Sequence, residues 1–165
     1  MNQNPEQIAR DNIDHQLLAG GWVIQGIKQI NLHAGVGVAV KEYVTDVGPA
    51  DYILFVEGKP CGVIEAKREE EGHRIGIHES QAEYYANAKL KHLKNESLPF
   101  VYISTGEVTT FTDFTDPKPR ARELFSFHRP ETLSSSTLSS SMSATVAFTT
   151  FGNKCWNITM LLKLA

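Results

Sequence analysis

Two carboxylates and a lysine stand at the ends of two short apolar segments. Asp51 opens the run DYILFV, while Glu65 and Lys67 lie at and just after the end of the run CGVIEA. The polar residues 57–60 join the two runs, and this pattern predicts adjacent strands of a hairpin. Glu65 and Lys67 are two positions apart, so they share one face of their strand. The sequence thus predicts a small patch with two carboxylates and one ammonium.

Such a trio suits the hydrolysis of a phosphodiester bond, which needs an activated water and a neutralised phosphate. Asp51 and Glu65 are the candidate Mg²⁺ ligands, because Mg²⁺ prefers oxygen donors and keeps several waters. The backbone carbonyl of Ala66 is a further candidate ligand. Lys67 is placed to orient the attacking water or help to take its proton. We therefore predict a catalytic site at Asp51, Glu65 and Lys67.

The register of the hairpin decides whether Asp51 joins this patch. A two-residue turn that sets residue 57 opposite Pro60 would pair Asp51 with Ala66, on the wrong face. A three-residue loop pairs Val56 with Pro60 and brings Asp51 opposite Glu65. The site therefore requires an odd-length loop or a bulge between Val56 and Pro60. The alternative is that Glu65 and Lys67 form an ordinary surface ion pair, although the apolar residues before them favour a site.

Three other positions are candidates for contacts with a nucleic acid or with the metal. Gln81 and Tyr85 are four residues apart on a predicted helix, so both project from one face and can bond phosphates or order the lysine. The alternative for them is a capping glutamine and a core tyrosine. Arg120 lies in a basic loop suited to phosphate contact, unless that loop is merely solvated. Glu6 is a possible auxiliary acid, or else a partner of Arg10.

Helix and strand patterns surround the hairpin. Asn4 and Pro5 form a helix start, and a helix is expected up to Gly20, with a stripe of apolar residues at Ala9, Ile13 and Leu17. Strands are expected at 22–27, around 36–40, at 100–104 and at 108–111, and a helix from about 80 to 94. This order predicts an α/β fold in which helices flank a mixed sheet.

Length, net charge and composition indicate the class of protein without fixing a function. It has 165 residues, a net charge of −3 and 41% hydrophobic residues, which is typical of one globular domain. We expect no membrane segment and a cytoplasmic location, since no long apolar run occurs and the two cysteines are far apart. The six histidines show no ligand spacing, which argues against a zinc site.

The composition changes at Ser134. Seven of the ten residues from Ser134 to Ser143 are serine, and such a stretch is typical of a linker. We therefore divide the chain into a domain at 1–133 and an atypical tail at 134–165.

The segments Gly48–Tyr52, Val63–Lys67 and 81–86 (QAEYYA) together resemble the N-terminal nuclease domain of type I restriction endonuclease R subunits (HsdR), of the PD-(D/E)xK superfamily. The likeness runs from the first helix to residues 127–131. It implies a three-layer α/β/α restriction-endonuclease-like fold with a central mixed sheet, and it assigns the catalytic positions to Asp51, Glu65 and Lys67. Gln81 and Tyr85 match the family's Gln-x-x-x-Tyr motif.

The resemblance also implies a function and partners. The family cleaves double-stranded DNA with Mg²⁺, in a complex with modification (methylase) and specificity subunits. Its translocase uses ATP, but the phosphate-binding motif of that translocase does not occur in these 165 residues. Two alternatives stay open: a non-catalytic docking module of the restriction complex, and a stand-alone repair or junction nuclease of the same superfamily.

Overall fold

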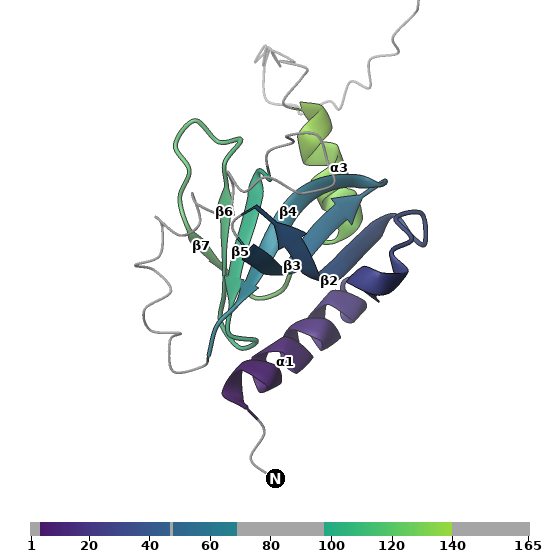
Figure 1. The fold of residues 1–165 in the computed structure, drawn as a ribbon. Helices are drawn as coiled ribbons and strands as arrows, with labels where there is room; N and C mark the ends of the chain where they lie inside the picture. The colour runs from purple at the N-terminus through teal and green to yellow at the C-terminus, as the bar shows by residue number, and fades with distance from the viewer. Residues whose placement is uncertain (1–3, 47, 69–97, 140–165) are drawn as a thin grey trace, which may run out of the picture.

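The chain folds around a mixed sheet in the computed structural model, which describes residues 4–46, 48–68 and 98–139. In these residues seven strands follow one another across the sheet in chain order (Figure 1). β1 is parallel to β2 and β4 is parallel to β5, whereas the other neighbouring pairs are antiparallel. The strands are β1 Val23–Gly26, β2 Gly37–Thr45, β3 Gly48–Val56, β4 Lys59–Ala66, β5 Phe100–Ser104, β6 Thr109–Asp113 and β7 Arg122–Leu124.

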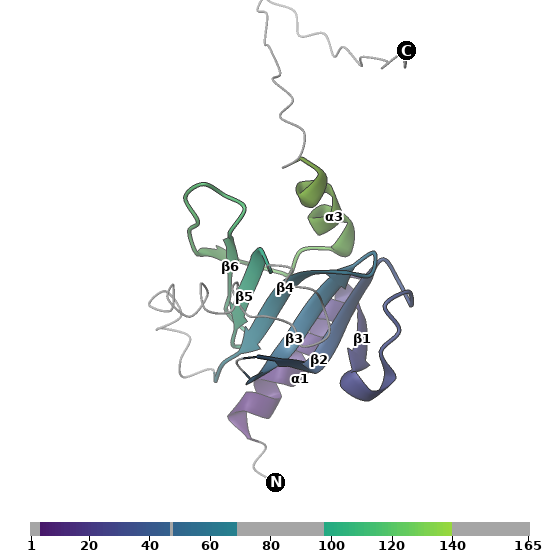
Figure 2. The same cartoon turned by 45° about the horizontal axis from the view of Figure 1, so that its top comes forward.

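Helix α1 (Pro5–Ala19) begins and ends where its capping residues predict. Asn4 Oδ1 accepts the backbone N–H of Glu6 at 3.3 Å, and Pro5 takes the first helical position, where its missing N–H costs no bond. The predicted apolar stripe is buried: Ala9, Ile13 and Leu17. Figures 1 and 2 show α1 crossing one face of the sheet.

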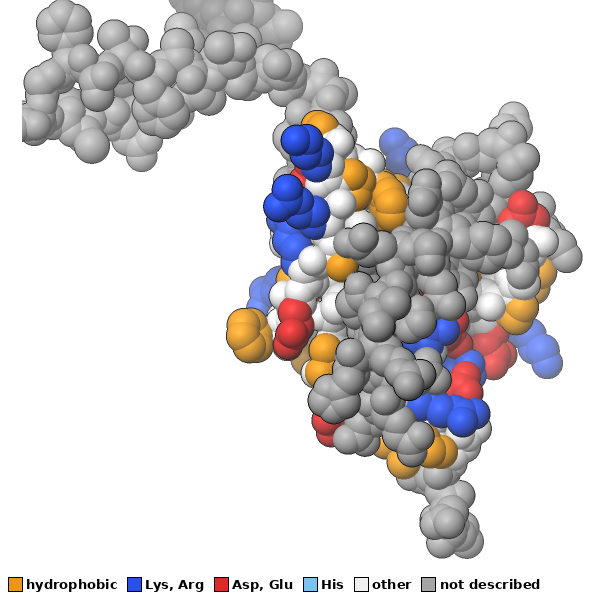
Figure 3. All heavy atoms as spheres, turned by 90° about the vertical axis from the view of Figure 1, so that its left-hand side faces the viewer, with side chains coloured by type: hydrophobic (Ala, Val, Ile, Leu, Met, Phe, Trp, Pro, Cys, Tyr) orange, Lys and Arg blue, Asp and Glu red, His pale blue; other side chains and the backbone are white. Residues whose placement is uncertain are grey.

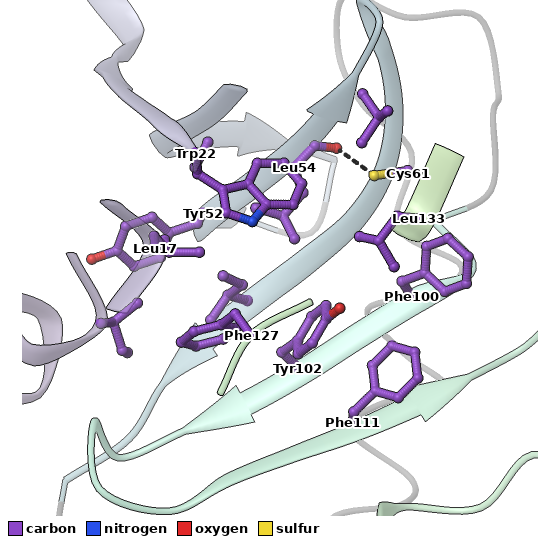
Figure 4. Close-up of a cluster of buried hydrophobic side chains, with 14 of the residues drawn as sticks. Leu17, Trp22, Tyr52, Leu54, Cys61, Phe100, Tyr102, Phe111, Phe127 and Leu133 are labelled. Atoms are coloured by element: carbon purple, nitrogen blue, oxygen red, sulfur yellow. Dashed lines mark hydrogen bonds between the residues drawn. The ribbon is translucent and has the colours of Figure 1, made fainter. Parts of the chain in front are cut away.

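Side chains that alternate along β3 divide the core between the two faces of the sheet. Tyr52, Leu54 and Val56 join a cluster that includes residues of α1, and part of this cluster is drawn in Figure 4. Ile53 and Phe55 join a second cluster on the opposite face. A strand buried on both faces explains why the run DYILFV is almost continuously apolar. The predicted α/β fold with a central mixed sheet is confirmed.

The turn between β3 and β4 has two residues, so the predicted three-residue loop is wrong. Val56 pairs with Lys59, and the residues between them, Glu57 and Gly58, have positive φ angles of 51° and 78°. Two left-handed residues in succession form a type I′ turn, whose twist matches that of the strands.

The extra residue that the register argument required lies in β4 instead. Leu54 pairs with Gly62 and Phe55 pairs with Pro60, which leaves Cys61 as a bulge. The Cys61 thiol is buried and donates to the Leu54 carbonyl at 3.4 Å, as Figure 4 shows. The bulge lies one residue beyond the predicted window and gives the same offset that the loop would have given.

Two elements near the C-terminal end of the described chain were not predicted, namely β7 and helix α3 (Pro130–Ser139). The linker prediction is wrong for residues 134–139, because α3 continues through them. Leu133 is buried in the α1-side cluster and fixes the start of the helix. A Cβ on Gly37 of β2 would lie 2.2 Å from Cγ of Pro130, so the close contact between α3 and the sheet requires a glycine there.

Some predictions fall outside the described residues. They are the helix at 80–94 with Gln81 and Tyr85, and the tail beyond residue 139. The division into 1–133 and 134–165 stays a prediction, although α3 crosses that boundary. Among the described helices, none has the length and apolar character needed to cross a membrane.

Candidate active site

The site lies where β3 and β4 separate. Their ladder ends at the pair of Tyr52 with Ile64, and the same register continued by one residue places Asp51 opposite Glu65. Beyond that point the backbone N–H of Ala66 donates to Asp51 Oδ2 at 2.8 Å. The Asp51 carboxylate thus takes the place of a ladder partner, and this bond holds it against the end of β4.

Glu65 and Lys67 are joined side by side at the end of β4. Lys67 Nζ lies 3.1 Å from Glu65 Oε1, and the two side chains are 18% and 14% exposed. The backbone N–H of Lys67 donates to the Ser104 carbonyl at 2.8 Å, which ties this end of the strand to β5. The Asp51 side chain is only 11% exposed. The structure therefore brings the three predicted residues together in a largely enclosed patch.

Arg10 of α1 completes the site, and the sequence analysis missed it as a site residue. Its Nη2 lies 2.5 Å from Asp51 Oδ1 and 3.2 Å from Glu6 Oε1. The predicted alternative for Glu6, a pair with Arg10, is thus observed. No local pattern in the sequence could have linked Arg10 to Asp51, because the two residues are 41 positions apart.

A fourth acidic residue, Glu42, faces the same point from β2. It lies between the pairs Lys41–Tyr52 and Tyr43–Ala50, which puts it level with Asp51. Its φ of 53° is left-handed, a conformation that costs energy for a residue with a side chain. Its Oε1 is 3.9 Å from Arg10 Nη1, and its side chain is 71% exposed.

Buried polar contacts fix α1 against the sheet beside the site. The Tyr52 hydroxyl donates toward Asp14 Oδ1 at 2.8 Å and toward the Arg10 carbonyl at 3.1 Å. Burial, together with the hydrogen bond to Asp14, raises the pKa of Tyr52, so the phenol stays protonated as a donor. Asp14 also forms an ion pair with Lys41, whose Nζ lies 2.7 Å from Asp14 Oδ2. These bonds hold the Arg10 backbone at a fixed place.

The donor set is suited to a hard cation. Among the described residues, no group of three or more His, Cys, Asp or Glu side chains is arranged as a metal site. Mg²⁺ does not need one, since it is commonly held by one or two carboxylates and completes its shell with water. Asp51 and Glu65 would supply the carboxylates, and both have a cationic side chain against them in this structure. The chemistry of the residues therefore fits Mg²⁺.

Arg120 lies apart from the trio, in the exposed loop between β6 and β7. With the other described residues it forms no ion pair or hydrogen bond, whereas its neighbour Arg122 pairs with Asp116 at 3.2 Å. Figure 3 shows the molecule from the side of Figure 1 on which β6 and β7 lie, and basic side chains gather along one edge of that face. The role predicted for Arg120 stays a prediction.

Comparison with known proteins identifies the family. Residues 27–110 match the family model described as the second domain of the type I restriction enzyme EcoKI endonuclease subunit. This segment contains the trio but neither Glu6 nor Arg10. No curated protein matches the chain.

A solved structure shares the fold, which confirms the predicted restriction-endonuclease-like fold. It is a fragment assigned as an HsdR subunit of a type I restriction enzyme from Vibrio vulnificus YJ016, with a TM-score of 0.59 and 23% identity. The match covers 85% of this chain and 26% of that one, so the chain spans about a quarter of its structural relative. Since the family model matches half of the chain, the chain belongs to the family of the type I restriction enzyme endonuclease subunit, in the region of its second domain.

Proposed function

We propose that this chain is the Mg²⁺-dependent DNA-cleaving module of a type I restriction endonuclease R subunit. The observation that carries the proposal is the separation of β3 and β4, where Asp51 accepts the Ala66 N–H between Glu65 and Lys67. A carboxylate pair and an ammonium at the ends of buried strands form a rigid, partly enclosed site. Such rigidity favours catalysis because the groups need little reorganisation.

Each residue of the trio has a distinct role in the proposal. Asp51 and Glu65, with the Ala66 carbonyl, would hold Mg²⁺, which when bound acidifies a water and neutralises charge on the phosphate. Lys67 Nζ would orient the attacking water and, as the neutral amine, would help to take its proton. Glu65 in turn holds the Lys67 ammonium at 3.1 Å. Glu6, which pairs with Arg10, is the possible auxiliary acid.

The substrate and partners follow from the family. We propose double-stranded DNA as the substrate, contacted by Gln81, Tyr85 and Arg120. The modification (methylase) and specificity subunits would complete the enzyme, and ATP would serve only the translocase region. A cytoplasmic location belongs to the same proposal. The chain spans 26% of its structural relative, so these statements concern the larger assembly.

The test is cleavage by the full-length subunit assembled with its partners. Asp51→Asn and Glu65→Gln each remove a metal-binding charge and are expected to abolish cleavage. Lys67→Ala removes the group that orients water and is expected to slow cleavage about 100- to 10,000-fold. ATP hydrolysis and translocation should remain near normal in all three. Wild-type cleavage by Lys67→Ala would refute the assignment, and a loss of ATP hydrolysis would indicate a coupling role instead.

Matched variants separate catalysis from DNA contact. Gln81→Ala and Tyr85→Phe remove neutral hydrogen bonds, worth about 0.5–1.5 kcal/mol each, so their effects should be milder than those of the trio. Arg122→Gln is the control. Arg122 lies on β7, three strands from β4 in the sheet, and it pairs with Asp116.

A non-catalytic docking module is the second candidate, and one observation favours it. Arg10 and Lys67 neutralise Asp51 and Glu65 within the protein, as structural ion pairs would. Calorimetric titration with Mn²⁺ separates the two candidates. A nuclease binds the ion and loses it in Asp51→Asn, whereas a docking module shows no binding that depends on Asp51.

A further inference from the structure

The Arg10 guanidinium lies against the carboxylate to which the proposed function assigns the metal. Its Nη2 contacts Asp51 Oδ1 and Glu6 Oε1 together, and its Nη1 faces Glu42. We propose that Arg10 is the resident counter-cation of the metal-free site, and that a divalent cation must displace its guanidinium from Asp51. The inference rests on the proposed function, because it requires a metal to bind there.

The bonds of Asp51 leave little room for both cations. Asp51 Oδ2 already accepts the Ala66 N–H at 2.8 Å, and Oδ1 accepts Arg10 at 2.5 Å. A metal that enters through Oδ1 takes the position of the guanidinium nitrogen. A metal on Oδ2 would lie close to the arginine charge in a patch where the Asp51 side chain is 11% exposed, and low exposure strengthens that repulsion. Either route opposes the presence of Arg10.

Arg10 is held by its charge more than by a complete set of hydrogen bonds. Its Nε is buried and has no hydrogen-bond partner among the described residues. A buried donor without a partner is costly, so this arrangement is one that a stronger cation can replace. The guanidinium thus neutralises Asp51 and Glu6 while leaving one of its own donors unsatisfied.

The structure also provides a position for the displaced guanidinium. The Arg10 carbonyl accepts the Tyr52 hydroxyl and the helix is fixed there, so only the side chain has to move. Glu42 Oε1 is 3.9 Å from Nη1, and the Glu42 side chain is 71% exposed. A movement of the guanidinium toward Glu42 would keep an ion pair while it frees Asp51.

This exchange predicts two opposite effects of removing the arginine. Without metal, Arg10→Gln leaves Asp51 and Glu6 uncompensated, so the thermal midpoint should fall. With metal, the competitor is gone and binding should tighten. A residue that merely positions Asp51 would behave differently, because its loss would weaken metal binding as well as stability.

The experiment measures Mn²⁺ binding to the whole chain by calorimetry, at constant ionic strength, together with thermal midpoints with and without the ion. We expect Arg10→Gln to bind Mn²⁺ at least about tenfold more tightly than the wild type, and to show a larger midpoint rise on adding Mn²⁺. Arg10→Lys, which keeps the charge but lacks the planar fork of guanidinium donors, should fall between them and serves if Arg10→Gln fails to fold. Arg122→Gln, which removes an arginine of β7 that pairs with Asp116 and not with the site, should match the wild type.

The outcomes distinguish this inference from the proposed function. Equal or weaker binding in Arg10→Gln, with binding by the wild type, overturns the exchange and leaves the metal site standing. Mn²⁺ binding by Arg10→Gln without binding by the wild type supports the exchange most strongly. If neither protein binds Mn²⁺, the proposed function fails and the exchange fails with it.

Discussion

At the residue scale, chemistry carried by neighbouring positions was predictable and chemistry across the fold was not. The pair of Glu65 with Lys67 follows from a two-residue spacing on a strand, and it is observed at 3.1 Å. The place of Asp51 followed from register. Arg10 was read only as a partner of Glu6, because helical spacing reports contacts four residues apart. Its bond to Asp51 depends on how α1 lies on the sheet.

The Tyr52 hydroxyl gives a residue-scale prediction of stability. Tyr52→Phe removes a buried donor from Asp14 and from the Arg10 carbonyl, so the free energy of unfolding should fall by about 1–3 kcal/mol. Urea unfolding followed by circular dichroism measures it. Tyr43→Phe is the control, since Tyr43 is a buried tyrosine whose hydroxyl bonds to no other described residue. Equal losses in both variants would contradict this role for the Tyr52 hydroxyl.

At the element scale, the pattern of strands was predictable, but the way the hairpin obtains its register was not. The apolar runs marked β3, β4 and β5, and the need for one extra residue was correct. Whether that residue lies in the turn or in the strand depends on twist, since a type I′ turn at Glu57–Gly58 suits paired strands and moves the irregularity to Cys61. Helix α3 was missed because its serine content is typical of linkers, and what stabilises it is the tertiary contact of Leu133.

The contact between α3 and β2 can be tested at Gly37. An added methyl group would meet Pro130 Cγ at 2.2 Å and Trp22 Cε3 at 2.9 Å, so the helix would have to move. We expect Gly37→Ala to lower the free energy of unfolding by about 1–3 kcal/mol, in line with overpacked cores. Gly26→Ala at the end of β1, where an added Cβ meets nothing within 4 Å, is the control and should change stability little. A native-like Gly37→Ala would mean that α3 does not dock as described.

At the scale of the whole molecule, one half-buried histidine joins three parts of the fold. The His128 ring lies 4.6 Å from the Phe111 ring, centroid to centroid, and its Nδ1 is 2.8 Å from the Tyr102 hydroxyl. The His128 carbonyl accepts the indole N–H of Trp22 at 2.9 Å. The segment between β7 and α3 thus ties the first turn after α1 to the middle of the sheet. No local pattern predicts such a contact, because its partners lie 17 to 106 residues away.

The protonation of His128 therefore sets part of the pH dependence of stability. Burial lowers the pKa of His128, and the charge of Asp113 opposes that shift only in part. Near the ordinary histidine pKa of about 6.5, the unfolded chain then binds a proton more readily than the folded one. Stability is full above that pH and falls as the pH drops from about 6.5 toward the lower folded pKa, below which this contribution levels off.

His128→Asn keeps a polar side chain without a titrating group, so its midpoint should be lower at pH 7.5 but should decline less between pH 7 and pH 5. Thermal midpoints across that range, compared with His33→Asn at an exposed position, measure the difference in slope, and equal slopes in wild type and His128→Asn would assign the acid sensitivity to other groups.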